Sequence, residues 1–260
     1  MDQTRSQQYL QAIGVVRWRS RYAPVAAVLP PVNPAPLKPP ASPEPPPAPV
    51  APDSPAPVPE LEPPLSTAWD WPTLQAKVAD CQACALRAGC SQTVFGTGNR
   101  QAELMLIGEA PGQDEDRQGE PFVGRAGQLL NQMLAAIGHQ REQVYIGNII
   151  KCRPPGNRDP KPEEIACCRG YIERQIELVA PKVLLCLGRV AAQALLANND
   201  PVGRLRGQWY CYGEHQIPLR VTYHPSYYLR TPAHKAFGWQ DLQQVMRQLR
   251  TKTGIDVAKS

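Results

Sequence analysis

Residues 102–137 read AELMLIGEAPGQDEDRQGEPFVGRAGQLLNQMLAAI: a short apolar run, a glycine-rich acidic loop and a helical pattern. The apolar run stops at Gly108, which is typical of a buried parallel strand. Beyond the loop, apolar residues recur at the spacing of one helix face: Leu129, Leu130, Met133, Leu134 and Ile137. Ligands of open α/β sheets bind at the carboxyl ends of strands, so residues 108–124 are predicted to line a ligand site.

The same alternation of strand and helix continues to the end of the folded region. Apolar runs predict strands at residues 103–107, 144–150, 182–187 and 219–223. Helical patterns lie at residues 161–180, 189–197 and 238–250. This order predicts a single three-layer α/β/α domain with a central four-stranded, mainly parallel sheet.

Prolines divide the chain. Of its 30 prolines, 18 lie between Pro24 and Pro64, where no helical or strand period exists. Residues 24–65 are therefore predicted to be a disordered, proline-rich linker. It would separate a short interaction peptide at residues 1–23 from a folded domain at 66–254, which a flexible tail at 255–260 follows.

Composition and charge indicate the compartment of the protein and the kind of partner that it binds. The formal net charge is +5 over 260 residues, a mild excess that suits an acidic partner such as nucleic acid without requiring one. The chain has no run of 18 apolar residues, and its first ten residues lack the order of a secretory signal. We expect a cytoplasmic monomer.

Eight cysteines in a cytoplasmic chain call for an explanation other than disulfides. Cys81 and Cys84 form a CxxC pair, and Cys152 and Cys168 follow far along the chain. Four thiolates suit a tetrahedral zinc ion or an iron–sulfur cluster. The long, proline-rich gap between the last two favours a cluster, with zinc and chance burial of free thiols as alternatives. The remaining cysteines are expected to be ordinary thiols: Cys90, Cys167, Cys186 and Cys211.

Three further side chains converge on the predicted carboxyl edge of the sheet. Phe122 is either a stacking platform for a flat ligand or a core anchor. Asn148 lies on an apolar strand, where a buried amide needs polar partners, and its donor and acceptor suit a base edge. His224 ends the fourth strand, because Pro225 stops the strand there. The acidic run DED at 114–116 offers magnesium ligands or a solvated loop, and the phosphate-binding glycine motifs are absent.

Three long motifs resemble one family. GEAPGQDEDRQGEPFVGRAGQLL, NIIKCRPPGNRDPKPEEIACCRGYI and TYHPSYYLR, with the cysteine set, are similar to the iron–sulfur, family 4 uracil-DNA glycosylases of bacteria and archaea. The resemblance covers residues 74–249. It implies a base-excision repair enzyme that acts on uracil in single- or double-stranded DNA. It also implies a 4Fe-4S cluster on Cys81, Cys84, Cys152 and Cys168.

The resemblance also implies roles for individual residues. Phe122 would stack on the flipped uracil, Asn148 would read its Watson–Crick edge, and His224 would donate to a carbonyl oxygen in the transition state. Gly108, Glu109 and Ala110 would line the floor and place the attacking water. Better-known glycosylases of the superfamily have a water-orienting aspartate at the position of Ala110 and a tyrosine at that of Gly112. Glu109 and Glu115 therefore compete to position the water, and we favour Glu109.

Residues near the cysteines and His224 are expected to touch DNA. Phosphate contacts are predicted at Lys151, Arg153, Arg158 and Arg230, and a wedge into the base stack at Tyr227, Tyr228 and Leu229. Two other functions stay open. One is a cluster-bearing binding module associated with a polymerase, and the other is a glycosylase with a broader base preference, such as hypoxanthine.

The N-terminal stretch YLQAIGVVRWRSR, residues 9–21, places apolar side chains among arginines. It is similar to the peptide by which the psi subunit of the bacterial replicase meets the clamp loader. That similarity implies a replisome partner, which the long linker would bring close to the glycosylase. The alternative is a basic tail that touches DNA nonspecifically.

Overall fold

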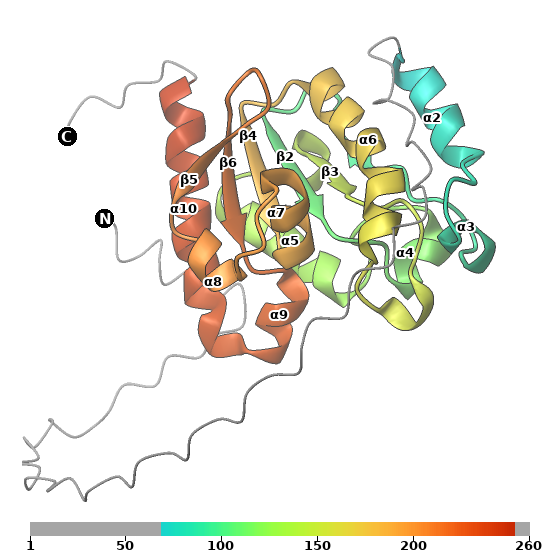
Figure 1. Ribbon diagram of the computed structural model, residues 1–260. Helices are drawn as coiled ribbons and strands as arrows, with labels where there is room; N and C mark the ends of the chain where they lie inside the picture. Colours follow the sequence, from blue (N-terminus) through green and yellow to red (C-terminus); the bar gives the residue numbers. More distant parts are fainter. Residues whose placement is uncertain (1–68, 253–260) are drawn as a thin grey trace, which may run out of the picture. The chain divides into compact units, whose positions relative to one another are not determined.

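The computed structural model describes residues 69–252. The predicted interaction peptide at 1–23, the linker at 24–65 and the tail at 255–260 lie outside the described residues. The described part forms one sheet of six strands in the order β1-β3-β2-β4-β6-β5. Helices cover both of its faces (Figure 1).

Four parallel strands form the centre of the sheet, as predicted. In sheet order they are β3 (Tyr145–Asn148), β2 (Leu104–Gly108), β4 (Val183–Leu187) and β6 (Ile217–Thr222). The sheet is larger than predicted, because antiparallel strands add to both edges: β1 (Thr97–Gly98) and β5 (Trp209–Tyr212). Neither edge strand shows apolar alternation, since β1 has two residues and β5 is only partly buried.

The register of the parallel strands brings their carboxyl ends to one edge. Gly108 of β2 pairs with Asn148 of β3, and Leu187 of β4 pairs with Thr222 of β6. The loops after these strands therefore start side by side. This edge is where the sequence predicts the ligand site.

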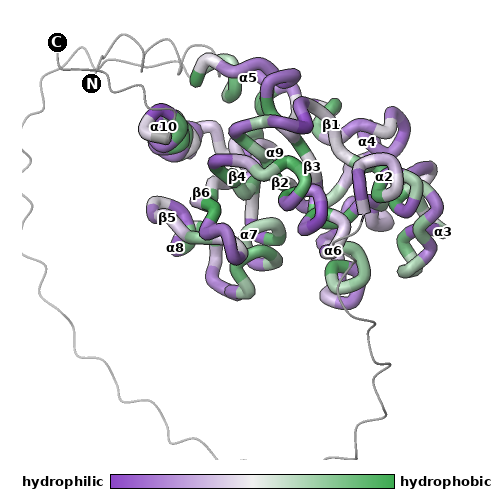
Figure 2. The backbone as a smooth tube through the Cα atoms, turned by 90° about the horizontal axis from the view of Figure 1, so that it is seen from above, coloured by the Kyte–Doolittle hydropathy of each residue, from purple (hydrophilic) through white to green (hydrophobic). Residues whose placement is uncertain are grey.

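Two apolar cores flank the sheet. Met105 and Ile107 belong to one core and Leu104 and Leu106 to the other, as the two-residue period of a strand requires. In Figure 2 the central strands are mainly apolar. The first core contains residues of α2 (Trp71–Ala79), α6 (Pro162–Val179), α7 (Arg189–Leu196) and α8 (Val202–Leu205). The second contains residues of α5 (Arg125–Ala136), α9 (Pro225–Arg230) and α10 (Lys235–Lys252).

Local signals in the sequence explain the helix ends. Pro162 and two acids open α6, and the Glu164 carboxylate accepts the backbone N–H of Lys161 at 2.8 Å. No helix within residues 69–252 is both long and apolar enough to cross a membrane. Short helices complete the domain: α3 (Leu86–Gly89), α4 (Gln113–Gln118), η1 (Arg141–Gln143), η2 (Pro155–Asn157) and η3 (Pro232–His234).

A buried ionic group fastens α10 to the sheet. Asp241 is fully buried and accepts from Arg220 of β6 at 3.1 Å and from Arg206 at 3.2 Å. Each charge is paired, which a buried ionic group requires. Both apolar and ionic contacts therefore hold α10 on its face of the sheet, the face opposite α6.

Candidate active site and cysteine pocket

Five residues meet at the carboxyl edge of the parallel strands, and we call them the strand-end site: Gly108, Glu109, Phe122, Asn148 and His224. Gly108 is the point of closest approach. A Cβ atom there would lie 2.4 Å from Asn148 Oδ1 and 2.6 Å from Phe122 Cζ. Only glycine leaves room for these two side chains to come together.

Asn148 carries an unsatisfied polar atom. Its side chain is 1% exposed, and its Oδ1 has no hydrogen-bond donor among the described residues. A buried acceptor without a donor costs about 1–3 kcal/mol. The strand-end site therefore favours a ligand that presents a hydrogen-bond donor to this oxygen.

Phe122 is held in an uncommon backbone conformation, with φ at +55°. Arg141 donates to the Phe122 carbonyl at 3.2 Å and also to the carbonyl of Pro121. Gly127 lets α5 approach, since a Cβ there would lie 1.7 Å from the Phe122 carbonyl oxygen. The ring is thus placed by several contacts around its own backbone.

Glu115 fixes the loop that carries Phe122. Its carboxylate accepts backbone N–H groups from Val123 at 2.9 Å, Gly124 at 3.0 Å and Gly112 at 3.1 Å. These three hydrogen bonds occupy the Glu115 carboxylate, which favours Glu109 as the group that would position a water molecule. Glu115 is engaged with the backbone, and Glu109 is the carboxylate left at the strand end.

His224 lies beside the aromatic ring, with ring centroids 5.4 Å apart and planes tilted by 30°. The backbone N–H of Ser226 donates to Nδ1 at 3.2 Å. Burial, reinforced by the charge of Arg230, lowers the pKa of His224 to about 4. The neutral ring therefore carries its proton on Nε2, which is free to donate to a ligand.

Glu109 is half-buried directly after β2. Burial raises its pKa to about 7, the nearby charge of Asp159 adds to that effect, and Arg189 opposes it. Arg189 and Asp159 also form an ion pair with each other. A carboxylate that titrates near neutrality suits the binding or activation of a water molecule.

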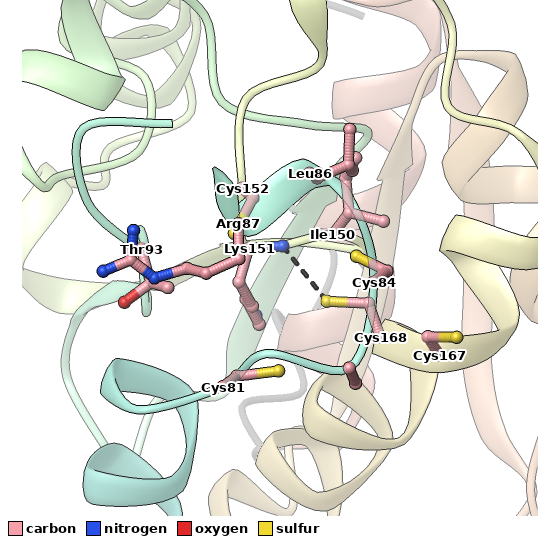
Figure 3. A pocket seen from close by; sticks show the side chains of 11 residues that line it. Cys81, Cys84, Leu86, Arg87, Thr93, Ile150, Lys151, Cys152, Cys167 and Cys168 are labelled. Atoms are coloured by element: carbon pink, nitrogen blue, oxygen red, sulfur yellow. Dashed lines mark hydrogen bonds between the residues drawn. The ribbon is translucent and has the colours of Figure 1, made fainter. Parts of the chain in front are cut away.

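Cysteines gather in a second place, the cysteine pocket, on the α6 side of the sheet. Five cysteines line it: Cys81, Cys84, Cys152, Cys167 and Cys168. In Figure 3 the sulfur atoms of Cys81, Cys84 and Cys168 point toward one another, while that of Cys167 points away. The space between protein atoms, including its open part, is about 340 Å³. Among residues 69–252, no group of three or more His, Cys, Asp or Glu side chains is arranged to hold a metal ion.

Burial raises the pKa of three thiols of the cysteine pocket, those of Cys84, Cys152 and Cys168. The pKa of Cys168 rises to about 12. The backbone N–H of Lys151 donates to Cys168 Sγ at 3.2 Å, a contact drawn in Figure 3. Four thiols with a backbone donor suit a group that binds thiolates and supplies positive charge.

Comparison with known proteins identifies the family. A family model described as the uracil DNA glycosylase superfamily matches residues 95–243. The type-4 uracil-DNA glycosylase of Archaeoglobus fulgidus is 45% identical over 163 residues, which make up 60% of this chain and 81% of that protein. The chain belongs to the type-4 uracil-DNA glycosylases. The resemblance seen in the motifs is thereby confirmed.

Other relatives agree with this membership. The type-4 uracil-DNA glycosylase of Thermotoga maritima is 41% identical over 163 residues, or 61% of this chain and 83% of that protein. A DNA polymerase of Bacillus phage SP01 is 30% identical over 164 residues, but these make up only 17% of that protein. The glycosylase thus matches about four fifths of each of these two type-4 relatives and a small part of the polymerase.

The structure corrects one predicted DNA contact of this glycosylase and limits another. Lys151 is 1% exposed, so it cannot reach a phosphate. Arg158 keeps 37% of its side chain exposed, but its guanidinium forks onto Glu164 at 2.6 and 2.8 Å. Arg153 is half-buried and donates to Asn157 at 2.7 Å, whereas Arg230 is exposed at the end of α9.

The structure also limits the residues that could wedge into the base stack. Tyr228 is 1% exposed, and its hydroxyl lies 2.8 Å from that of Thr222, so it belongs to the core. Tyr227 is half-buried, and its ring stacks on Tyr223 with centroids 4.5 Å apart. Leu229 is half-buried as well.

Sequence reasoning missed three polar residues around the strand-end site. Arg141 acts on Phe122 from 19 residues away along the chain, and Asp159 and Arg189 act on Glu109 from still farther. Each lies in a polar loop or at a helix start, where charged residues are common. The one signal in the sequence is their place in the chain, because each lies in a segment next to a predicted strand.

Proposed function

We propose that the chain extrudes uracil from DNA into the strand-end site and hydrolyses its N-glycosidic bond there. As a type-4 uracil-DNA glycosylase it is a DNA-repair enzyme, a hydrolase of N-glycosyl bonds that acts on uracil in DNA. The observation that carries the site assignment is the buried, unpaired Asn148 Oδ1. Ala110, which is half-buried beside Glu109, would complete the floor.

Asn148 would select the base. The N3–H of uracil is a donor and its O4 is an acceptor, whereas cytosine has an acceptor at N3 and a donor at N4. With Oδ1 facing N3–H and Nδ2 facing O4, the amide pairs with uracil and opposes cytosine. Uracil would thus satisfy the oxygen that the folded protein leaves without a donor.

Phe122 and His224 would act on the same flipped ring. Phe122 is 6% exposed and belongs to the second core, and Arg141 holds its backbone, so the flipped base would stack on a ring that is placed before it arrives. As the glycosidic bond breaks, negative charge develops on the uracil oxygens. A neutral Nε2–H donor at His224 stabilises that charge more strongly in the transition state than in the ground state.

Glu109 would position the attacking water. Its raised pKa, about 7, makes the carboxylate a stronger base than an ordinary glutamate. Asp159 and Arg189 would tune this group from opposite directions. The carboxylate charge would also stabilise the cationic sugar that forms when uracil departs.

We also propose that the cysteine pocket holds a 4Fe-4S cluster. A cubane takes one thiolate at each of four iron atoms, so it does not need three side chains on a single ion. Cys81, Cys84, Cys152 and Cys168 supply these thiolates, and the bound cluster supplies the positive charge that lets them ionise. The protein segments around residues 81–84, 152 and 168 would be joined by it.

The activity test is a single-turnover cleavage assay on oligonucleotides that carry one uracil, hypoxanthine or mismatched thymine. We expect release of uracil from single- and double-stranded DNA and none of thymine. Binding of DNA without release of a base would favour the alternative function, a binding module associated with a polymerase. The similarity to a phage DNA polymerase is the reason to test it. Release of hypoxanthine at a similar rate would indicate the broader base preference.

The cluster has its own test. Protein purified without oxygen should be brown and hold about four iron and four sulfide per chain. Stoichiometric zinc without iron would contradict the cluster and leave the glycosylase assignment untouched.

We propose that the N-terminal residues bring the enzyme to sites of DNA replication. Residues 9–21 would dock on a clamp-loader subunit, with the linker keeping a cytoplasmic, monomeric enzyme near replication forks. The test is capture of purified clamp-loader subunits by residues 1–24 fused to an inert carrier, compared with a Trp18→Ala fusion. Equal capture by both, or loss of capture at moderate salt, would leave only a nonspecific basic tail.

A further inference from the structure

Lys151 is a buried lysine whose ammonium group is fully hydrogen-bonded to neutral groups. The residue is 1% exposed. Its Nζ donates to the carbonyls of Phe95 at 3.1 Å and Asn148 at 3.0 Å, and to Gln175 Oε1 at 2.7 Å. These three acceptors match the three N–H donors of an ammonium ion. The side chain is therefore arranged to be charged.

Within residues 69–252, no carboxylate balances this charge. The ion pairs among residues 69–252 include none with Lys151, and its three acceptors are all uncharged. An isolated buried charge is strongly unfavourable, so a buried lysine is normally paired with an opposite charge. The part of the chain that the structure describes leaves Lys151 without one.

The cysteine pocket can supply the missing negative charge. Lys151 lines this pocket, precedes Cys152 in sequence, and donates its backbone N–H to Cys168 Sγ at 3.2 Å. Four thiolates more than neutralise the cationic core of an iron–sulfur cluster, so the complete assembly is anionic. The Lys151 ammonium group lies close enough to Cys168 for their charges to interact.

We propose that Lys151 is the internal counter-ion of the cluster-bearing cysteine pocket and links it to the strand-end site. This inference rests on the cluster proposed above. The link is the hydrogen bond from Lys151 Nζ to the backbone carbonyl of Asn148. The side chain of Asn148 is the one that would face the flipped uracil. Loss of the cluster would leave the ammonium unbalanced and so strain the turn between Asn148 and Lys151.

The same charge should set how easily the cluster accepts an electron. Adding one electron makes the assembly more negative, and a nearby buried cation stabilises that state. Removing the cation should therefore move the reduction potential to more negative values. It should also weaken cluster retention, since groups that support metal ligands commonly contribute about 10- to 100-fold to metal affinity.

The experiment uses the full chain, with cluster, as Lys151→Met and as wild type. The reduction potential is measured by spectroelectrochemical titration, and iron release by the rate of transfer to a chelator. We expect a more negative potential and release that is about tenfold faster. Lys182→Met is the matched control, because Lys182 lies at the opposite edge of the sheet, where it pairs with Glu103.

A second variant guards against a Lys151→Met protein that fails to fold. Gln175→Glu keeps the lysine but places a carboxylate against its ammonium group, which offsets the charge without removing the side chain. It should also shift the potential to more negative values. Wild-type potential and release rate in either folded variant would overturn the inference. Absence of iron from the wild-type protein would instead contradict the cluster proposal.

Discussion

The strand-end site and the cysteine pocket lie on either side of one short turn, residues 148–152, yet they are organised in opposite ways. The strand-end site is complete in the protein alone: Phe122 is fixed through its backbone and His224 is held in one tautomer. Its unsatisfied atom is a single amide oxygen. The cysteine pocket instead holds five cysteines, and burial raises the thiol pKa of Cys84, Cys152 and Cys168. Beside it lies a lysine that has no charged partner among residues 69–252.

This difference indicates what each region requires from its ligand. The strand-end site requires a hydrogen-bond donor of the right shape, so changes there should reduce chemistry and spare the fold. The cysteine pocket requires charge compensation, so changes there should mainly reduce stability, with a smaller effect on chemistry through the turn between Asn148 and Lys151. Catalysis depends on groups placed before the substrate arrives, whereas a structural cluster contributes its binding energy to folding itself.

The largest expected effect is that of Asn148→Ala. Loss of one preorganised polar contact to the reacting base commonly costs about 10²- to 10³-fold in rate, and we expect a loss of that size in single-turnover uracil release. The melting temperature should change little or rise, because an unsatisfied buried oxygen is removed. Asn131→Ala, on an exposed position of α5, is the control. A near-native rate would remove the proposed role of the strand-end site.

Cys152→Ser should show the opposite behaviour. We expect most of the iron to be lost and the melting temperature to fall, while uracil release at low temperature stays within about tenfold of wild type in the folded fraction. Cys211→Ser, at an exposed position, is the control and should keep both iron and stability. A large loss of rate in a fully folded, cluster-free protein would show that the two regions are not separable.

The pH dependence of uracil release tests Glu109. The active form is the carboxylate, and its pKa is raised to about 7, so the rate should fall as pH drops through 7, approaching tenfold per unit. His224, with a pKa near 4, stays neutral over this range and does not shape the profile. Asp159→Asn removes a charge that raises the Glu109 pKa, and should move the acid limb to lower pH. Arg189→Gln should move it to higher pH, and an unshifted limb in both variants would exclude Glu109 as the titrating group.

The smallest effect is expected for Arg141→Gln. Arg141 donates to the carbonyls of Pro121 and Phe122, which lie before and after the Phe122 Cα atom. Its loss should loosen the stacking ring and raise KM several-fold, with a smaller change in kcat. Arg125→Gln, at the exposed start of α5, is the control. Equal changes in both variants would mean that Arg141 acts only through overall charge.

The sequence by itself determined the framework of this protein. Apolar runs that stop at glycine or proline, and helices with acidic first turns, predicted the four central strands and the helices between them. Those signals are local, because strand and helix periods are read over a few residues. The motif residues Gly108, Asn148 and Phe122 were predicted to meet for the same reason, since parallel strands end at one edge.

Only the tertiary structure decided what the charged residues do. Lys151 reads as a phosphate contact beside an arginine, yet it is buried against Gln175, 24 residues away. Glu115 and Glu109 are equivalent by composition, and only the fold shows that Glu115 accepts the backbone N–H groups of Val123 and Gly124. A charged side chain takes its function from the partners that surround it, and those partners come from segments that folding alone brings together.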